Sequence, residues 1–208
     1  MGKITKSNQL INSKIVIYFI YIIFLLILPA FIFADQIDEN LIKARLLSGK
    51  YLETVSAYPS NSKIDQAINI YNSVLSDSTA TKLQKAEAKK EIAMCYQYKK
   101  EYDNEIKVLN EFMDDNDITI EDMEFALYQR GYVEYLKNDY QSAILTYTKL
   151  KNNFAYSGKN SKVPYGVYMW GLCLDALGDM AGAKAKYQEV IKEYDKHEAK
   201  TAAQWQIQ

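Results

Sequence analysis

The chain has 208 residues, of which 49% are hydrophobic and 25% charged, and its formal net charge is −1 at pH 7. Beyond residue 34, 22 basic and 26 acidic residues remain, a net charge of about −4 on side-chain counting. A mildly acidic chain without a Lys/Arg cluster is a poor binder of nucleic acid, because that affinity depends on neutralising phosphates. We therefore exclude nucleic acid as a partner.

The chain opens with a basic, then an apolar, then an acidic stretch. Residues 1–14 carry three lysines, the 19 residues from Ile15 to Phe33 carry no charge, and acidic residues begin at Asp35. This order is typical of an export signal and predicts that the chain beyond residue 34 leaves the cytoplasm for the periplasm or cell envelope. Ala34 favours cleavage, whereas the apolar length approaches the roughly 20 residues that span a bilayer. Residues 1–34 are thus either a cleaved signal peptide or an inner-membrane anchor with its N-terminus in the cytoplasm.

Residues 35–61 follow as a predicted N-terminal helical cap. Apolar residues recur at helical spacing from Ile37 to Leu47, and Gly49 interrupts the pattern. The segment from Ile64 to Leu75 is predicted to be the second helix of an imperfect first repeat at residues 62–80. An atypical terminal repeat is expected because one of its faces lacks a neighbour.

A pair of residues four positions apart recurs at intervals of 38, 38 and 40 residues. The four pairs are Ala67 and Tyr71, Glu105 and Leu109, Ala143 and Tyr147, and Ala183 and Tyr187. Such a period marks a helical solenoid. It predicts full repeats at residues 81–117, 118–157 and 163–195, closed by a capping helix at residues 196–208.

Helix boundaries within these repeats follow from capping residues and prolines. Thr81 with Gln84 is a capping-box pattern, and Thr119 with Asp122 has the same spacing. Pro164 suits a first helical turn. The expected helices are a first helix opening after Thr81, then Tyr102 to Met113, Ile120 to Lys137, Tyr140 to Asn153, Pro164 to Leu177 and Met180 to Tyr194.

The repeat resembles the tetratricopeptide repeat (TPR). The residues that carry the resemblance are Gly131, Tyr140, Ala143 and Tyr147, and again Gly171, Met180, Ala183 and Tyr187. The resemblance implies an all-α, right-handed superhelical solenoid of helix-turn-helix hairpins, preceded by one hydrophobic N-terminal helix. It is most similar to bacterial envelope TPR proteins, such as the Tol-Pal-associated cell-division coordinator and the outer-membrane assembly lipoprotein. Glu105 departs from the pattern by replacing Ala, and Arg130 and Glu134 stand where apolar residues usually pack and are expected to face water.

Residues that could carry chemistry are few. The single histidine, His197, is expected to be exposed at a helix end, and no nucleophile or metal-ligand motif accompanies it. The acidic run from Asp114 to Asp117 lacks the Gly and later Glu of a calcium loop and is expected to be a solvated turn. Cys95 and Cys173 share a motif position two repeats apart, too far for a disulfide, and are expected to be buried and unpaired. We predict a noncatalytic protein without metal or cofactor.

The resemblance also implies a concave groove lined by the first helix of each repeat. The residues expected there are Lys90, Met94, Phe125, Tyr128, Tyr132, Tyr135, Tyr165 and Tyr168. An apolar stripe at helical spacing is also the ordinary pattern of a helix face that packs in a core. Tyrosine is enriched at interfaces because it combines apolar area with a hydroxyl group. Both interpretations of the stripe stay open.

These observations favour an exported scaffold that binds a protein or peptide partner in its groove, in cell-envelope assembly or maintenance. The alternative is an inner-membrane-anchored companion of protein secretion with a holdase-like role, which requires that residues 1–34 stay attached and contact the membrane.

Overall fold

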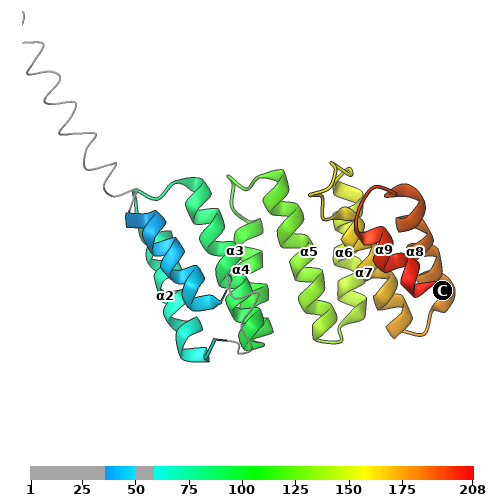
Figure 1. Ribbon diagram of the computed structural model, residues 1–208, viewed down its shortest axis with the longest axis horizontal. Coiled ribbons are helices and arrows are strands. Elements are labelled where there is room, and N and C mark those ends of the chain that lie inside the picture. The colour runs from blue at the N-terminus through cyan, green and yellow to red at the C-terminus, as the bar shows by residue number, and fades with distance from the viewer. Residues whose placement is uncertain (1–35, 50–58) are drawn as a thin grey trace, which may run out of the picture.

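The computed structural model describes residues 36–49 and 59–208, and within these ranges the regular secondary structure is helical, without strands. Figure 1 shows the helices standing side by side along the long axis, with the helix at residues 36–48 at one end and α9 at the other. The predicted signal peptide or anchor at residues 1–34 lies outside the described residues. No helix in the described ranges combines the length and the apolar character needed to cross a membrane.

Eight labelled helices follow the helix at residues 36–48, and two of them begin and end at the predicted residues. Helices α4 and α6 coincide with the predicted segments, and α5 is shorter than predicted by one residue. The bounds are α2 Asn61–Ser76, α3 Lys82–Lys99, α4 Tyr102–Met113, α5 Ile120–Leu136, α6 Tyr140–Asn153, α7 Val163–Ala176, α8 Met180–Glu193 and α9 Ala199–Gln206.

Side-chain caps fix where several helices start. The Thr81 hydroxyl accepts a hydrogen bond from the Gln84 backbone N–H (3.2 Å), and the Gln84 side-chain oxygen accepts one from the Thr81 N–H (2.9 Å), which confirms the predicted capping box. Thr119 caps α5 in the same way, accepting from the Asp122 N–H at 3.1 Å. These contacts satisfy backbone N–H groups that have no partner within the helix.

The turn inside each full repeat contains one residue in the left-handed conformation. Lys100 (φ 59°), Asn138 (φ 62°) and Gly178 (φ 84°) occupy this position in successive repeats. A positive φ lets the chain reverse within a few residues, and glycine adopts it without steric strain. The same backbone turn therefore joins the two helices of every full repeat.

A glycine in the first helix of a hairpin makes room for a tyrosine of the second helix. A Cβ atom added at Gly131 would lie 2.6 Å from Cε1 of Tyr147, and one at Gly171 would also overlap the ring of Tyr187. Both tyrosine rings are buried, with exposures of 0% and 1%. The small residue that recurs in the first helix thus leaves the space that the recurring tyrosine ring of the second helix fills.

The buried apolar residues form three clusters along the solenoid. The N-terminal cluster surrounds Tyr71 and joins the helix at residues 36–48 to α2 and α3. A small middle cluster contains Leu109, Phe112 and Ala126, and the C-terminal cluster surrounds Tyr147 and Tyr187 and extends to α9. Each repeat therefore buries its apolar face against its neighbours, as expected for a solenoid.

Polar contacts supplement the small middle cluster between α4 and α5. The Gln129 amide donates to the Glu105 carboxylate at 3.0 Å, and the Arg130 guanidinium donates to the side-chain oxygen of Asn110 at 2.9 Å. Both bonds connect the second repeat to the third.

The prediction that Glu134 faces water is wrong, whereas Arg130 is partly exposed. Glu134 is only 5% exposed, and its carboxylate accepts hydrogen bonds from Arg130 (3.0 Å) and from the Thr146 hydroxyl (2.6 Å). Arg130 is partly covered. A buried carboxylate is tolerated when it is paired and hydrogen-bonded, and here both partners are close by.

Candidate partner-binding groove

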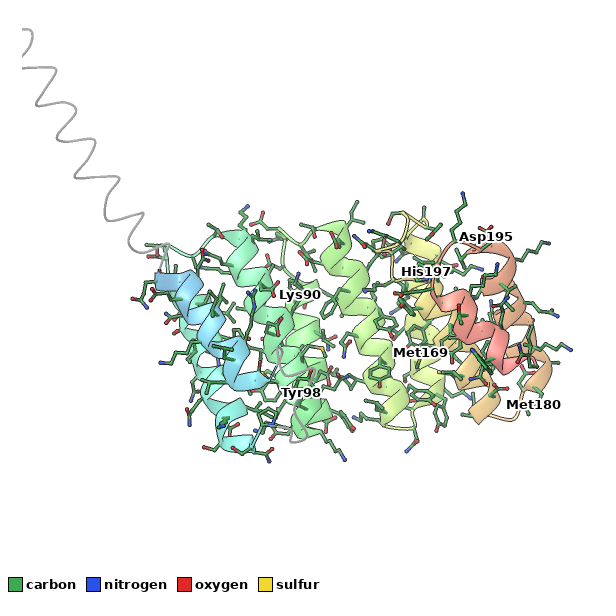
Figure 2. The ribbon with its side chains drawn as sticks, in the orientation of Figure 1. Lys90, Tyr98, Met169, Met180, Asp195 and His197 are labelled. Atoms are coloured by element: carbon green, nitrogen blue, oxygen red, sulfur yellow. The ribbon has the colours of Figure 1, made fainter. Side chains whose placement is uncertain are left out.

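A groove of about 520 Å³ lies among α3, α5 and the N-terminal end of α7. In Figure 2, Lys90 and Tyr98 lie at different heights along α3, and His197 lies beside α9. The residues that line the groove are Glu87, Lys90, Glu91, Met94, Tyr98, Glu121, Asp122, Phe125, Lys159, Asn160, Lys162, Tyr165 and Glu198.

Half of the predicted groove residues line this space. Lys90, Met94, Phe125 and Tyr165 do so, and their positions come from three successive repeats. This arrangement follows from the shared position of the first helices, which present equivalent residues side by side.

The other four predicted residues are not part of this lining and pack against the C-terminal cluster. Tyr128, Tyr132, Tyr135 and Tyr168 are all partly buried there. The ring centroid of Tyr128 lies 6.4 Å from that of Tyr147, and the centroid of Tyr168 lies 5.8 Å from that of Tyr187. Tyr165 packs against this cluster as well, with its ring centroid 6.0 Å from that of Tyr128, so the aromatic stripe is partly buried along its whole length and only Phe125 and Tyr165 of it line the groove.

Apart from Lys90, the charged residues that line the groove were not among the predicted ones. Glu91 follows Glu87 by one helical turn, so helical spacing could have placed it on the same face. Lys159, Lys162 and Glu198 belong to connecting segments, whose approach to α3 and α5 depends on the packing of the whole solenoid.

A network of ion pairs spans the floor of the groove. The Lys90 ammonium lies 2.8 Å from the Asp122 carboxylate on α5 and 3.8 Å from that of Glu87 on its own helix. Arg45 approaches Glu87 from the helix at residues 36–48, at 2.8 Å. These contacts hold the first helices of the solenoid together across the groove.

The prediction that His197 is exposed is wrong. Its ring is 3% exposed and meets the Tyr165 ring edge to face, with centroids 4.8 Å apart. Its Nδ1 atom accepts a hydrogen bond from the Ala199 N–H at 3.2 Å. The ring is buried because α9 folds back against α7, a long-range contact that sequence spacing does not show. His197 thus supports the end of the groove that Tyr165 lines.

Tyr165 is fixed at this end by its hydroxyl group. The hydroxyl donates a hydrogen bond to the Glu198 carboxylate, and the Lys162 ammonium lies 5.8 Å from the ring centroid. Burial, together with the bond to Glu198, raises the pKa of Tyr165 to about 12. The phenol therefore stays protonated at neutral pH and keeps Glu198 in place.

The acidic run from Asp114 to Asp117 contains two carboxylates that form ion pairs with lysines. Asp115 pairs with Lys89 at 2.7 Å and Asp117 with Lys82 at 2.6 Å. Among residues 36–49 and 59–208, no three His, Cys, Asp or Glu side chains are grouped to hold a metal ion.

The two cysteines are buried and unpaired, as predicted. Burial, assisted by Glu91 and Glu134 respectively, raises the pKa of both Cys95 and Cys173 to about 12. Their thiolates are therefore scarce at neutral pH, and a thiol without thiolate character is a poor nucleophile.

Comparison with known proteins identifies the repeats. The family model for the tetratricopeptide repeat matches residues 125–155 and 165–197, which correspond to the hairpins α5–α6 and α7–α8. These hairpins are tetratricopeptide repeats, and the described chain is an all-α TPR solenoid. TPRs generally serve as scaffolds for protein interaction rather than as catalysts.

Solved structures that are similar to this chain include a kinesin light chain and MamA. The nearly identical TPR-like repeats of a kinesin light chain from Podosopora anserina have 11% sequence identity and a TM-score of 0.58, over 82% of this chain and 82% of that one. MamA has 21% identity and a TM-score of 0.47, over 62% of this chain and 68% of that one. No curated protein matches the sequence. Likeness at these identities concerns the fold, so the similarity to the bacterial envelope branch stays a prediction.

Proposed function

We propose that this protein is a noncatalytic TPR scaffold that holds a segment of a partner protein in the groove among α3, α5 and α7. The observation that carries the proposal is a concave space of about 520 Å³ in which apolar side chains alternate with charged ones. Met94, Phe125 and Tyr165 offer apolar area, and Tyr98 is 45% exposed at the same groove. Such a surface suits an extended or helical peptide segment.

The proposed place of action is the bacterial cell envelope. Support comes from the basic, apolar and acidic order of the first residues of the chain, which is typical of export. If the apolar segment is retained, the scaffold is instead an inner-membrane-anchored companion of protein secretion with a holdase-like role.

The mass of the N-terminus from fractionated cells separates these two versions. A chain that begins at Asp35 in a soluble envelope fraction supports a released adaptor. An intact N-terminus in the inner-membrane fraction supports the anchored companion. Recovery of the intact chain in the cytoplasm contradicts both versions.

Site-specific photo-crosslinking tests the groove in living cells. A photoreactive amino acid at Met94 or Phe125 is expected to give adducts with a partner protein. The control position is Leu145 on α6, which is 65% exposed and lies outside the groove lining. Equal adduct yields at all three positions, or none at the groove, contradict the proposal.

Tyr98→Ala removes a side chain that lines the groove and is 45% exposed. It is expected to lower the yield of groove adducts, and its melting temperature measures how much of that loss comes from a loss of stability. Tyr168→Ala is a poorer test, since its ring packs near Tyr187 and its removal is expected to lower stability as well.

A further inference from the structure

Large apolar side chains gather on the outer face of the helix at residues 36–48. Ile42 is 50% exposed, and Leu46, one turn further along the same face, is 58% exposed. Leu83 at the start of α3 is 75% exposed and borders the same space as Ile42. The inward side of the helix, which carries Leu41, packs in the N-terminal cluster. This terminal helix is therefore apolar on both sides, whereas the outer face of a terminal repeat is ordinarily polar.

Basic side chains lie beside this outer face. Lys43 and Lys63 are both exposed, and together with Ile42 and Leu46 they line a space of about 350 Å³, to which Glu39 also contributes. A lysine can lay its methylene stem along apolar surface and keep its ammonium group among polar headgroups. Apolar and basic side chains on one helix face are the chemistry of a helix that lies in a membrane interface.

The position of this face in the chain indicates what covers it. The described part begins at Gln36, and the uncharged run from Ile15 to Phe33 ends three residues earlier. At about 1.5 Å per residue, Ile42 lies about 9 Å and Leu46 about 15 Å along the helix from Gln36. A run that stays in the bilayer would therefore hold the outer face close to the lipid headgroups. Such a short tether makes the contact intramolecular in effect, so that a few apolar side chains are enough to maintain it.

We infer that the outer face of the helix at residues 36–48 rests on the lipid surface, with Ile42, Leu46 and Leu83 entering the interface between headgroups and acyl chains. This inference rests on the anchored version of the proposed function and gives the solenoid an orientation. Figure 1 shows this helix at one end of the long axis and α9 at the other, so the axis would point away from the membrane. The groove among α3, α5 and α7 lies further along this axis and would stay accessible to a partner protein.

The test uses the full-length chain reconstituted into vesicles of phosphatidylcholine and phosphatidylglycerol. An environment-sensitive fluorophore is attached to one introduced cysteine, either at Leu46→Cys or at one of two control positions. The controls are Leu145→Cys on α6 and Trp205→Cys on α9, where the native side chains are 65% and 72% exposed. The native Cys95 and Cys173 are buried and do not compete for the label.

The label at Leu46→Cys is expected to emit at shorter wavelength than the control labels. Spin-labelled lipid is expected to quench it at least about threefold more strongly than it quenches the labels on α6 and α9, because only the N-terminal end enters the interface.

Variants in the chain labelled at Leu46→Cys assign the contact to the outer face. Ile42→Gln is expected to lower the quenching about twofold, because it removes apolar area next to the label. The matched control is Ile120→Gln on α5, where the native side chain is 72% exposed, and it is expected to leave the quenching unchanged. Melting curves verify that the solenoid is intact. If Ile42→Gln lowers the melting temperature, Lys43→Gln retains the test, and it is expected to lower the quenching only in vesicles that contain phosphatidylglycerol.

Failure of this inference differs from failure of the proposed function. A chain that floats with the vesicles while its label at Leu46→Cys stays in water overturns the membrane contact alone. Equal quenching at all three labelled positions also overturns it. Shielding of the Leu46→Cys label in detergent that grows with protein concentration overturns it as well, because a second copy then covers the face. A chain that does not float overturns the anchored version and this inference with it, whereas absence of groove adducts in cells overturns the scaffold function.

Discussion

At the scale of single residues, Glu105 is the most unusual feature of the molecule. It is fully buried in α4 at a position where the repeat usually has a small residue. One carboxylate oxygen accepts a hydrogen bond from Gln129, whereas the other has no partner in the part of the chain that the structure describes. Burial raises the pKa of Glu105 to about 8, against which the Gln129 bond acts only partly.

This pKa makes stability depend on pH. Between about pH 4.5 and pH 8 the folded state keeps the proton and the unfolded state loses it, so the free energy of unfolding falls as pH rises through this window. The fall is up to about 5 kcal/mol, at about 1.4 kcal/mol for each pKa unit. Glu105→Gln keeps a neutral side chain and is expected to flatten the slope and to be more stable than the wild type at pH 8.

Urea denaturation of both proteins at several pH values checks this prediction. Parallel pH profiles for the wild type and Glu105→Gln contradict it, since other titrating groups would then account for the whole slope.

Gly131 is a position where the packing leaves no room for a larger side chain. Replacing a mid-helix glycine by alanine ordinarily stabilises a helix by up to about 1 kcal/mol. Here the new methyl group would lie 2.6 Å from the Tyr147 ring, which is buried and has little room to move. We expect Gly131→Ala to destabilise the protein by roughly 1–3 kcal/mol, as overpacking does.

Chemical denaturation measures this effect, and a double variant isolates its cause. Adding Tyr147→Leu to Gly131→Ala is expected to cost less than the sum of the two single changes, because the ring that clashes is gone. A rise in stability of Gly131→Ala alone contradicts the prediction.

At the scale of helices, local signals predicted the boundaries well. The ends of α4 and α6 were predicted to the residue, and so was the capping box at Thr81. Such features depend on side chains a few positions apart, which the sequence displays directly. The repeat period then fixed which helices pair.

The errors concern residues whose partners are distant in sequence. Glu134 looked exposed because it is charged, yet Thr146 on the next helix supplies a buried donor. His197 looked exposed because it follows a helix end, yet α9 folds it against Tyr165. The same limit applies to the groove, where Lys90, Met94 and Phe125 of α3 and α5 were predicted and the residues of the connecting segments were not.

The capping box of α3 gives a prediction at this scale. Thr81→Ala removes the acceptor for the Gln84 N–H and is expected to lower stability by about 1 kcal/mol, as loss of an N-cap does. Ser76→Ala is the control, because that exposed hydroxyl donates only to a carbonyl oxygen one turn back, and it is expected to change stability by less than about 0.5 kcal/mol. Equal effects in thermal unfolding contradict the assignment of the cap.

At the scale of the whole molecule, the apolar core is divided. The N-terminal and C-terminal clusters are joined by a small middle cluster and by the polar contacts between α4 and α5. In a solenoid, stability is approximately a sum of repeat and interface contributions, so a local defect acts mainly on its neighbours.

Tyr147→Leu tests this division. The change leaves a cavity in the C-terminal cluster and is expected to speed hydrogen exchange in α5 to α8 more than in α2 and α3. The reciprocal variant, Tyr71→Leu, is expected to give the opposite pattern. Uniform acceleration along the chain in both variants would indicate a single cooperative unit.

The two buried thiols allow this division to be followed at native residues of the chain. Cys95 belongs to the N-terminal cluster and Cys173 to the C-terminal cluster, and neither is exposed in the folded chain. Each sulfur therefore meets an alkylating reagent only when its own half of the solenoid opens. Mass analysis of the alkylated peptides would give the alkylation rate of each cysteine separately. Each rate reports how fast the corresponding half of the solenoid unfolds.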